Sequence, residues 1–276
     1  MPRKATSEQN SDNARDNKYA APALEKGLDI LEALADEAVG LTQSELAQRL
    51  GRSTSEIFRM VQTLQRRGWV MVMPGDRYRL SLHMFELSHR QRPLRSLVEA
   101  ALPLMQDVSR RLLQSCHLSV AESGRLMVVA QTDSPGMLCF AVRTGAVLGL
   151  LNTSSGHVLL AFASDAERER IIDAHIMLSG GLIKRPAGLD DVLDEVRRQG
   201  YAQERSEQVF GVTNLAFPVF DRSGLPVASM VIPFLEGLGG PDRETQIQEA
   251  LGLLGQTAAA LSRRLGYVAA EAELQA

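Results

Sequence analysis

Apolar residues recur at helical spacing over residues 22–35, and two further helical segments follow shortly afterwards. Each of these segments begins with a capping box, in which a Thr or Ser hydroxyl and a Glu side chain satisfy free backbone N–H groups. The boxes are Thr42-Gln43-Ser44-Glu45 and Ser53-Thr54-Ser55-Glu56, and Gly51 and Gly68 are placed to end the two helices. Two capped helices joined by so short a turn predict a helix-turn-helix. The apolar stripe expected for the first helix is Leu24, Leu28, Leu31, Leu34 and Ala35.

The second capped helix has two different faces. Ile57, Met60 or Val61, and Leu64 recur at core spacing, whereas the residues nearest the helix start on the other side are free to meet DNA bases. The alternative is a capped helical hairpin inside an unrelated core.

A short basic hairpin follows these helices. Two strands, residues 69–72 and 78–80, flank the turn Pro74-Gly75-Asp76 and predict a wing whose arginines meet phosphate. The complete set of expected DNA contacts is Thr42, Ser53, Thr54, Ser55, Phe58, Arg59, Gln62, Arg77 and Arg79.

The net charge of −3 conceals an uneven distribution of charge. Residues 39–95 contain ten Arg and Lys against four Asp and Glu, a local excess of +6, so the remainder of the chain carries −9. Such asymmetry is expected when one part of a protein faces phosphate and the other does not.

The remainder of the chain has a different texture. Residues 1–20 are polar, so we expect a disordered tail before a winged-helix domain at residues 21–82. Residues 82–114 are predominantly helical, with Pro93 and Pro103 expected to divide the segment. From His117 onward strands and helices mix, which predicts an α+β domain. The expected strands are residues 117–121, 126–130, 138–142, 213–220 and 226–232, and the expected helices are residues 154–162, 190–198 and 242–266.

Several segments resemble the IclR family of bacterial transcriptional regulators. In the DNA-binding part the resemblance rests on residues 23–31, 46–51 and 67–70, and on Ser55 and Arg59, which match the serine and arginine of the family's recognition helix. In the second part it rests on residues 196–202 and 211–221, which are similar to the family's GAF-like effector domain.

The resemblance implies a linker helix at residues 83–97 and an effector-binding domain at residues 98–272. By position it nominates Ser154, Ser155, Glu204, Asn214, Val231 and Pro233 as effector contacts. A negative Glu204 beside apolar Val231 and Pro233 favours a neutral or weakly acidic effector, with an aromatic or largely apolar body, over a small polar acid. IclR-like proteins pair, so we expect a homodimer or homotetramer on a pseudo-palindromic operator.

Other chemistry finds little support in the sequence. Cys116 and Cys139 are the only cysteines, and there is no metal-ligand cluster or phosphate-binding glycine loop. No signal peptide or membrane-spanning run is found, so we expect a cytoplasmic regulator without catalytic residues, metal or cofactor. Its expected partners are double-stranded operator DNA and a small-molecule effector. Two alternatives remain: a constitutive DNA-binding protein whose second domain serves only oligomerisation, and a small-molecule enzyme with an appended DNA-binding domain.

Overall fold

The computed structural model describes residues 21–90, 92–207, 209–236 and 242–268. The chain divides into two compact units, Met1–Arg92 and Pro93–Ala276. The tail expected at residues 1–20 lies outside the described residues. Each unit has a hydrophobic core of its own, and each is therefore described by itself.

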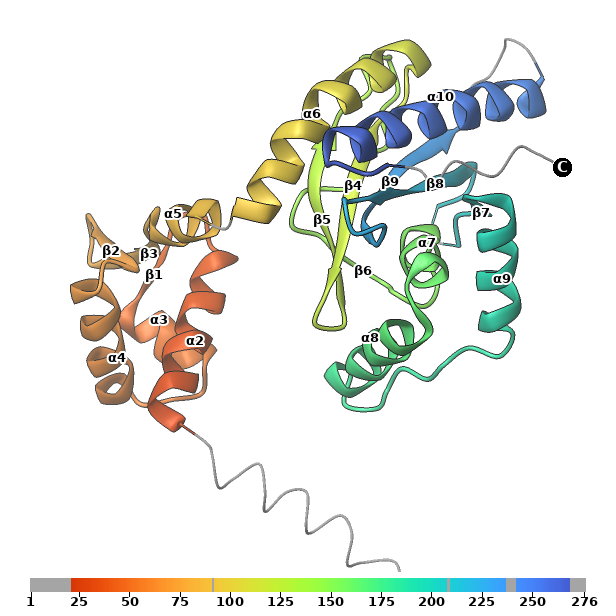
Figure 1. Ribbon diagram of the computed structural model, residues 1–276. Coiled ribbons are helices and arrows are strands. Elements are labelled where there is room, and N and C mark those ends of the chain that lie inside the picture. The colour runs from red at the N-terminus through yellow and green to blue at the C-terminus, as the bar shows by residue number, and fades with distance from the viewer. Residues whose placement is uncertain (1–20, 91, 208, 237–241, 269–276) are drawn as a thin grey trace, which may run out of the picture. The chain divides into compact units, whose positions relative to one another are not determined.

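The N-terminal unit is a winged helix-turn-helix. Its elements, in order, are α2 (Pro22–Ala35), β1 (Leu41–Thr42), α3 (Gln43–Arg49), α4 (Thr54–Arg66), β2 (Val70–Met73), β3 (Arg77–Leu80) and α5 (His83–Arg90) (Figure 1). The strands form an antiparallel sheet in the order β1-β3-β2. The core of this unit includes Ile30, Leu34, Leu46, Ile57, Val61, Val70 and Tyr78.

Both capping boxes predicted from the sequence are present. The Thr42 hydroxyl accepts from the Glu45 N–H at 3.3 Å, and the Glu45 carboxylate accepts from the Thr42 N–H at 2.7 Å. Ser53 and Glu56 form the same reciprocal pair at the start of α4, at 3.4 and 3.3 Å. These paired ends fix where α3 and α4 begin, and so set the turn between them.

The apolar stripe expected for the first helix is only partly correct. Leu31 and Leu34 are buried, but Leu24 and Leu28 are 63% and 49% exposed, and Ala35 is exposed as well. Polar residues instead make the contacts between the first half of α2 and the turn and helix that follow α3: Lys26 pairs with Glu56 at 2.5 Å, and Asp29 pairs with Arg52 at 2.9 Å. Ion pairs therefore replace apolar packing there.

The C-terminal unit is a six-stranded antiparallel sheet with helices on both faces, which confirms the predicted α+β class. Its elements are α6 (Arg92–Leu112), β4 (Cys116–Glu122), β5 (Arg125–Thr132), β6 (Val147–Leu148), α7 (Ser154–Phe162), α8 (Asp165–Leu178), α9 (Leu189–Gln199), β7 (Ala202–Arg205), β8 (Val212–Phe220), β9 (Pro226–Leu235) and α10 (Arg243–Arg264). The strand order is β6-β5-β4-β9-β8-β7. Helices α6 and α10 cover one face, and α7, α8 and α9 lie on the other (Figure 1).

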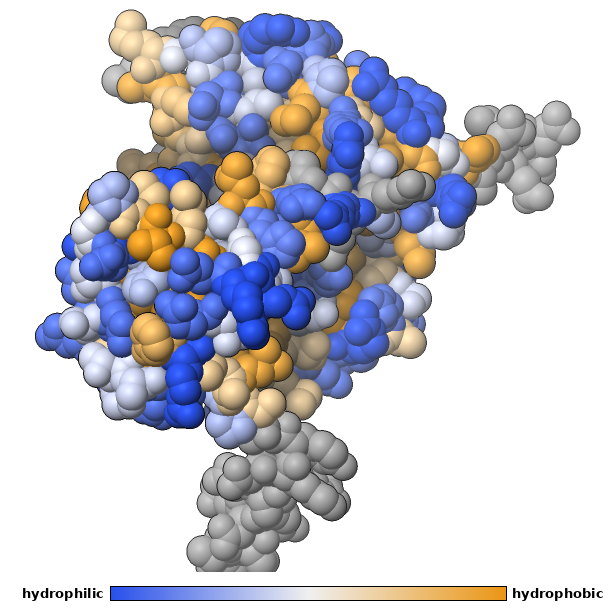
Figure 2. All heavy atoms as spheres, turned by 90° about the vertical axis from the view of Figure 1, so that its left-hand side faces the viewer, coloured by the Kyte–Doolittle hydropathy of each residue, from blue (hydrophilic) through white to orange (hydrophobic). Residues whose placement is uncertain are grey.

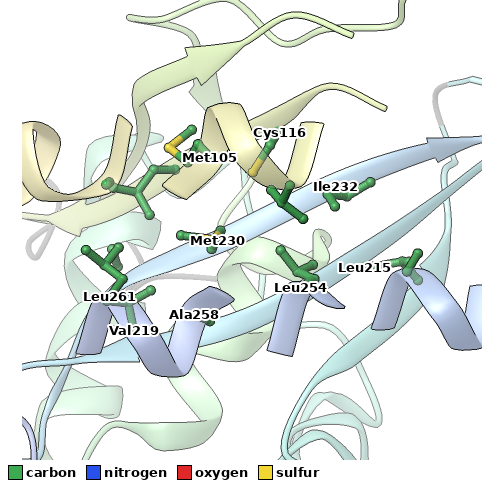
Figure 3. Packing of buried hydrophobic residues seen from close by; sticks show 14 of the residues in the cluster. Met105, Cys116, Leu215, Val219, Met230, Ile232, Leu254, Ala258 and Leu261 are labelled. Atoms are coloured by element: carbon green, nitrogen blue, oxygen red, sulfur yellow. The ribbon is translucent and has the colours of Figure 1, made fainter. Parts of the chain in front are cut away.

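The two faces of the sheet have separate cores because side chains alternate along each strand. Met230 and Ile232 of β9 meet Met105 of α6 and Leu254 of α10 in one cluster (Figure 3). Val231, between them in sequence, belongs to the cluster beneath α7 on the opposite face. The long strand β9 therefore serves both layers.

Residues 138–142 do not form the predicted strand. The segment lies in a loop in which the Ser134 hydroxyl donates to the Leu113 carbonyl at 2.7 Å and accepts from the Gly136 N–H at 3.0 Å. This turn diverts the chain before it can pair, and the strand that completes this edge of the sheet is β6.

Pro103 does not divide the helical segment as predicted. Helix α6 runs continuously from Arg92 to Leu112, with Pro93 in its first turn and Pro103 in its interior. Pro103 lies on the exposed side, where water can bond the Glu99 carbonyl that lacks its usual donor. Ala101 and Met105, both fully buried, hold the helix against the sheet on the other side.

Gly156 and Gly252 are both helical glycines, but only one is constrained by its surroundings. A Cβ at Gly156 would overlap the carbonyl oxygen of Leu150, whereas nothing lies within 4 Å of one at Gly252. We expect Gly156→Ala to lower the free energy of unfolding by at least about 2 kcal/mol, because backbone must move. Gly252→Ala should leave it unchanged or raise it by up to about 1 kcal/mol. Urea denaturation of both variants measures the difference, and equal effects would contradict it.

Candidate functional site

The face of α4 predicted to meet DNA is the exposed face of the helix. Ile57 and Val61 are buried in the core of the N-terminal unit. The residues predicted on the opposite side are all exposed, and they are Thr54, Ser55, Phe58, Arg59 and Gln62. Phe58 is 48% exposed, an unusual position for an aromatic ring. Figure 2 shows one face of the molecule, on which hydrophilic residues in blue and smaller groups of hydrophobic residues in orange are intermixed.

Arg59 is the basic residue of this face that is free to bind a ligand. Within the described residues its guanidinium has no carboxylate or carbonyl partner, and the same holds for Arg66 and Arg67 at the end of α4. The prediction from sequence did not include Arg66 and Arg67, although both belong to the local excess of positive charge. By contrast, Arg49 bonds Glu37 at 2.5 Å and is already neutralised.

The two wing arginines differ in their surroundings. The Arg77 Nε donates to the Gly40 carbonyl at 3.1 Å, and its guanidinium lies 3.0 Å from Glu45. Arg79 is exposed, and its guanidinium has one hydrogen-bond partner among the described residues, the Met71 sulfur at 3.7 Å. Arg77 therefore ties the wing to α3, whereas Arg79 is available to an external anion.

Three further polar groups of this unit are already bonded. The hydroxyls of Thr42 and Ser53 cap α3 and α4. Glu56 accepts hydrogen bonds from Lys26 and from Ser53, which lower its pKa to about 2, the bond from Lys26 having the largest effect. The negative charge of Glu56 on the recognition helix is therefore balanced by Lys26.

The C-terminal unit contains a cavity of about 410 Å³ between the sheet and the starts of α7 and α9. Five of the six nominated effector residues line it: Ser154, Ser155, Glu204, Asn214 and Val231. Pro233 is buried opposite Asn214 in β9 and is not among the lining residues. The apolar part of the cavity wall includes Phe140, Val142, Leu148, Leu151, Leu189 and Val192.

The N-terminus of α7 forms one wall of this cavity. Thr153 is the capping residue, and its hydroxyl accepts from the Gly156 N–H at 3.3 Å. Ser154 and Ser155 are each 2% exposed, line the cavity, and have no side-chain hydrogen bond within the described residues. Since the first N–H groups of a helix have no acceptor in the helix, this wall favours a group that accepts hydrogen bonds.

Glu204 is paired with a histidine in the same cavity. Its carboxylate lies 2.6 Å from His157 Nδ1, and His157 Nε2 lies 3.0 Å from the Leu151 carbonyl. Both ring nitrogens face acceptors, an arrangement that requires the imidazolium form. Burial lowers the pKa of His157, but the hydrogen bond and charge of Glu204 outweigh it and the pKa is raised. His157 is therefore a basic partner of Glu204, which the sequence alone did not reveal.

The described residues offer no site for a metal ion, since none of their His, Cys, Asp and Glu side chains gather in groups of three or more. Cys116 is buried and Cys139 is exposed, and neither forms a disulfide. None of the helices described is long and apolar enough to cross a membrane.

Comparison with known families identifies both units. Residues 23–72 match the IclR helix-turn-helix domain, and residues 94–263, more than half of the chain, match the C-terminal domain of the bacterial transcriptional regulator IclR. The chain belongs to the IclR family. It is a transcriptional regulator with a DNA-binding helix-turn-helix domain and a ligand-binding C-terminal domain, as predicted.

Individual relatives agree with this assignment to the IclR family. The HTH-type transcriptional regulator KdgR of Escherichia coli (strain K12) is 32% identical over 242 residues, which cover 86% of this chain and 90% of KdgR. The regulator XynR of the same organism is 26% identical over 251 residues, which cover 90% of this chain and 98% of XynR. These relatives are transcriptional regulators and lend no support to either alternative function.

Solved structures of other regulators share the fold of this chain. HmgR of Pseudomonas aeruginosa aligns with a TM-score of 0.67 at 26% identity, covering 90% of this chain and all of that one (100%). An IclR homolog from Microbacterium hydrocarbonoxydans, solved in complex with 4-hydroxybenzoate, aligns with a TM-score of 0.71 at 21% identity. That alignment covers 88% of this chain and 99% of the homolog.

The raised pKa of His157 predicts how the pair with Glu204 depends on pH. The pair contributes fully below the unfolded pKa of about 6.5 and is lost as the pH rises through the higher folded value. We expect Glu204→Gln to lower the free energy of unfolding by about 1–3 kcal/mol at pH 6 and by less at pH 9. Thermal unfolding of wild type and variant at both pH values measures this. Glu195→Gln, on the exposed side of α9, is the control, and a pH-independent effect of Glu204→Gln would contradict the prediction.

Proposed function

We propose that this IclR regulator binds a pseudo-palindromic DNA operator as a homodimer or homotetramer, and that a small organic effector bound in the cavity controls its affinity. The observation that carries the DNA part is the exposed face of α4, where Arg59 has no partner among the described residues. One recognition helix contacts only a few base pairs. Two paired copies of the protein contact two half-sites, and together these make a longer operator. The proposed site of action is the cytoplasm, without catalysis.

Within the operator complex, Ser55 and Arg59 of α4 meet base edges and Arg79 of the wing meets phosphate. Arg66 and Arg67 are further phosphate contacts because both are exposed and unpaired within the described chain. Phosphate contacts supply affinity, and base contacts supply sequence preference. Thr42, Ser53 and Arg77 act in this proposal by holding α3, α4 and the wing in position.

The proposed effector has an aromatic or largely apolar body. The cavity wall supports this, since Phe140, Leu151 and Val192 offer apolar contact while a few polar groups converge on the same space. Pairing with His157 removes the charge that disfavoured a weak acid, so a neutral or weakly acidic effector fits equally well.

The experiment that tests the function is binding of the full-length protein to the DNA upstream of its own gene. Fluorescence anisotropy with that DNA and with a scrambled duplex measures specificity, first alone and then with a panel of aromatic and small-acid metabolites. Equal affinity for both duplexes contradicts operator binding. Unchanged affinity with every metabolite contradicts control by these effector classes.

Arg59 is the side chain whose loss should weaken specific binding most. We expect Arg59→Ala to fold normally and to cost about 1–3 kcal/mol of operator binding, because the pairing of a guanidinium with a guanine edge is removed. Arg198→Ala, which removes an exposed arginine of α9, is a matched loss of charge and should bind as wild type does. Anisotropy at one fixed salt concentration compares the three proteins. Operator affinity unchanged in Arg59→Ala removes Arg59 from the interface.

The wing arginines should separate into two roles. Arg79→Ala should weaken binding to all DNA sequences and flatten the log–log salt dependence by about 0.9, the slope that one phosphate neutralised by an arginine contributes. Arg77→Ala should mainly lower the unfolding midpoint, since Arg77 joins the wing to Glu45 and to the Gly40 carbonyl. Salt titration and thermal unfolding of both variants distinguish the roles, and a changed sequence preference in Arg79→Ala would show that the wing reads bases.

A further inference from the structure

His117 of β4 is a buried histidine that the resemblance to the family does not nominate. It is 3% exposed and lines the cavity, yet neither Nδ1 nor Nε2 has a hydrogen-bond partner within the described residues. Burial lowers the pKa of His117 to about 4, so the ring is neutral at neutral pH. A neutral imidazole has one N–H donor and one acceptor nitrogen, and both are without partners here.

The next residue pair on the same face of the sheet is also polar and unpartnered. Ser119 of β4 lies directly opposite Ser229 of β9, and both hydroxyls are buried without a partner in the described chain. Buried polar atoms are nearly always satisfied in folded proteins, because an unmade hydrogen bond is costly. Ser119 and Ser229 do not line the cavity, so His117 is the one of these three side chains that a bound molecule can reach there.

The sheet register places His117 far from the other polar end of the cavity. His117 lies opposite Val231, Val231 opposite Ala216, and Ala216 opposite Ala202. Ala216 and Ala202 belong to the packed core and do not line the cavity, whose lining residues on β9, β8 and β7 are Val231, Asn214 and Glu204. Strands β4 and β7 are three strand spacings apart, about 14 Å. On the floor of the cavity, apolar Val231 therefore separates His117 from the polar side chains of Asn214 and Glu204.

We propose that His117 binds the effector directly, and that the effector carries a polar group at each end of an apolar body. The group at the His117 end is a neutral hydroxyl, carbonyl or amide, which forms a hydrogen bond with the donor or the acceptor nitrogen of the neutral imidazole. The other end meets the polar groups around His157 and Glu204. This inference rests on the proposed function, since it names the chemical class of the effector bound in the same cavity.

Two other chemistries fit this arrangement less well. A compact acid such as pyruvate reaches one polar end only and leaves the other unpaired. A carboxylate at the His117 end would meet a neutral ring and no opposite charge, so burial of its charge there would be uncompensated.

The first experiment asks whether His117 has a structural partner. Unfolding midpoints of the full-length protein are compared for wild type, His117→Phe and the smaller His117→Leu. Since an unpaired polar ring is replaced by an apolar side chain, at least one variant should unfold at or above the wild-type temperature. His175→Phe is the matched control, because His175 Nδ1 bonds the Gly124 carbonyl at 2.7 Å and its loss should lower the midpoint. A fall in both His117 variants as large as in His175→Phe overturns the proposal.

The second experiment tests the class of effector with two probes that differ at one end. Calorimetric titration should show wild type binding 4-hydroxybenzamide about ten-fold more tightly than benzamide, the value of one hydrogen bond. The His117 variants should bind the two probes equally. Equal affinities in wild type, or a preference that survives in both variants, overturns the proposal.

The outcomes also separate this inference from the proposed function. Failure of 4-hydroxybenzamide to bind wild type overturns the effector class proposed here, whereas operator binding is judged by the anisotropy experiment without any effector. Discrimination between the probes without operator binding supports His117 as an effector contact and contradicts only the DNA part of the proposed function.

Discussion

The close approach of α7 to the turn before it is the constraint on which the effector domain depends. Gly156 packs against the Leu150 carbonyl with no room for a side chain, so the first turn of α7 can lie buried against that turn. This position brings Ser154 and Ser155 to the cavity wall and lets His157 reach both Leu151 and Glu204. A side chain as small as a methyl group at position 156 would displace α7. The contacts of Ser154, Ser155 and His157 would then be lost together, because these residues share one short segment of backbone.

In the DNA-binding unit, competition among charges decides which arginines remain available. Every Arg and Lys contributes equally to the local excess of positive charge, but in the structure only some of these side chains remain without a carboxylate partner. Arg49, Arg52 and Arg77 bond carboxylates within the unit, whereas Arg59 and Arg79 bond none among the described residues. The first three hold the helices and wing together, and the remaining two lie on the surface where charge is accessible to phosphate. Net charge therefore overstates the number of cations that a helix-turn-helix offers to DNA.

Much of the fold could be predicted from the sequence because local chemistry decides it. The capping boxes at Thr42 and Ser53 and the boundaries of α7 need only neighbouring residues. The errors arise where distant residues decide the outcome: Pro103 continues α6 because its exposed side faces water, and residues 138–142 turn away because Ser134 bonds Leu113. Helix α8 was not predicted, although Ser164 caps it, because its charges lie all around it and only Ile172 is buried. In the cavity, the partner of Glu204 could not be found from sequence, since β7 and α7 meet only in the folded chain.

The charges that line the cavity leave it close to neutral, and this shifts the basis of selectivity. The negative charges of Glu204 and Glu207 are offset by the positive charges of protonated His157 and Arg205. His117 adds no charge because its ring is neutral. The cavity therefore has only a weak preference for ligands of one charge, and it must select its ligand through the geometry of hydrogen bonds. Sites of this kind discriminate strongly against an analogue that lacks one polar group, because the buried partner of that group is left unpaired. Within the described part of the chain, the side chains of His117, Ser154 and Ser155 line this cavity without a hydrogen-bond partner of their own, so a wrong ligand is rejected by the bonds that it fails to make.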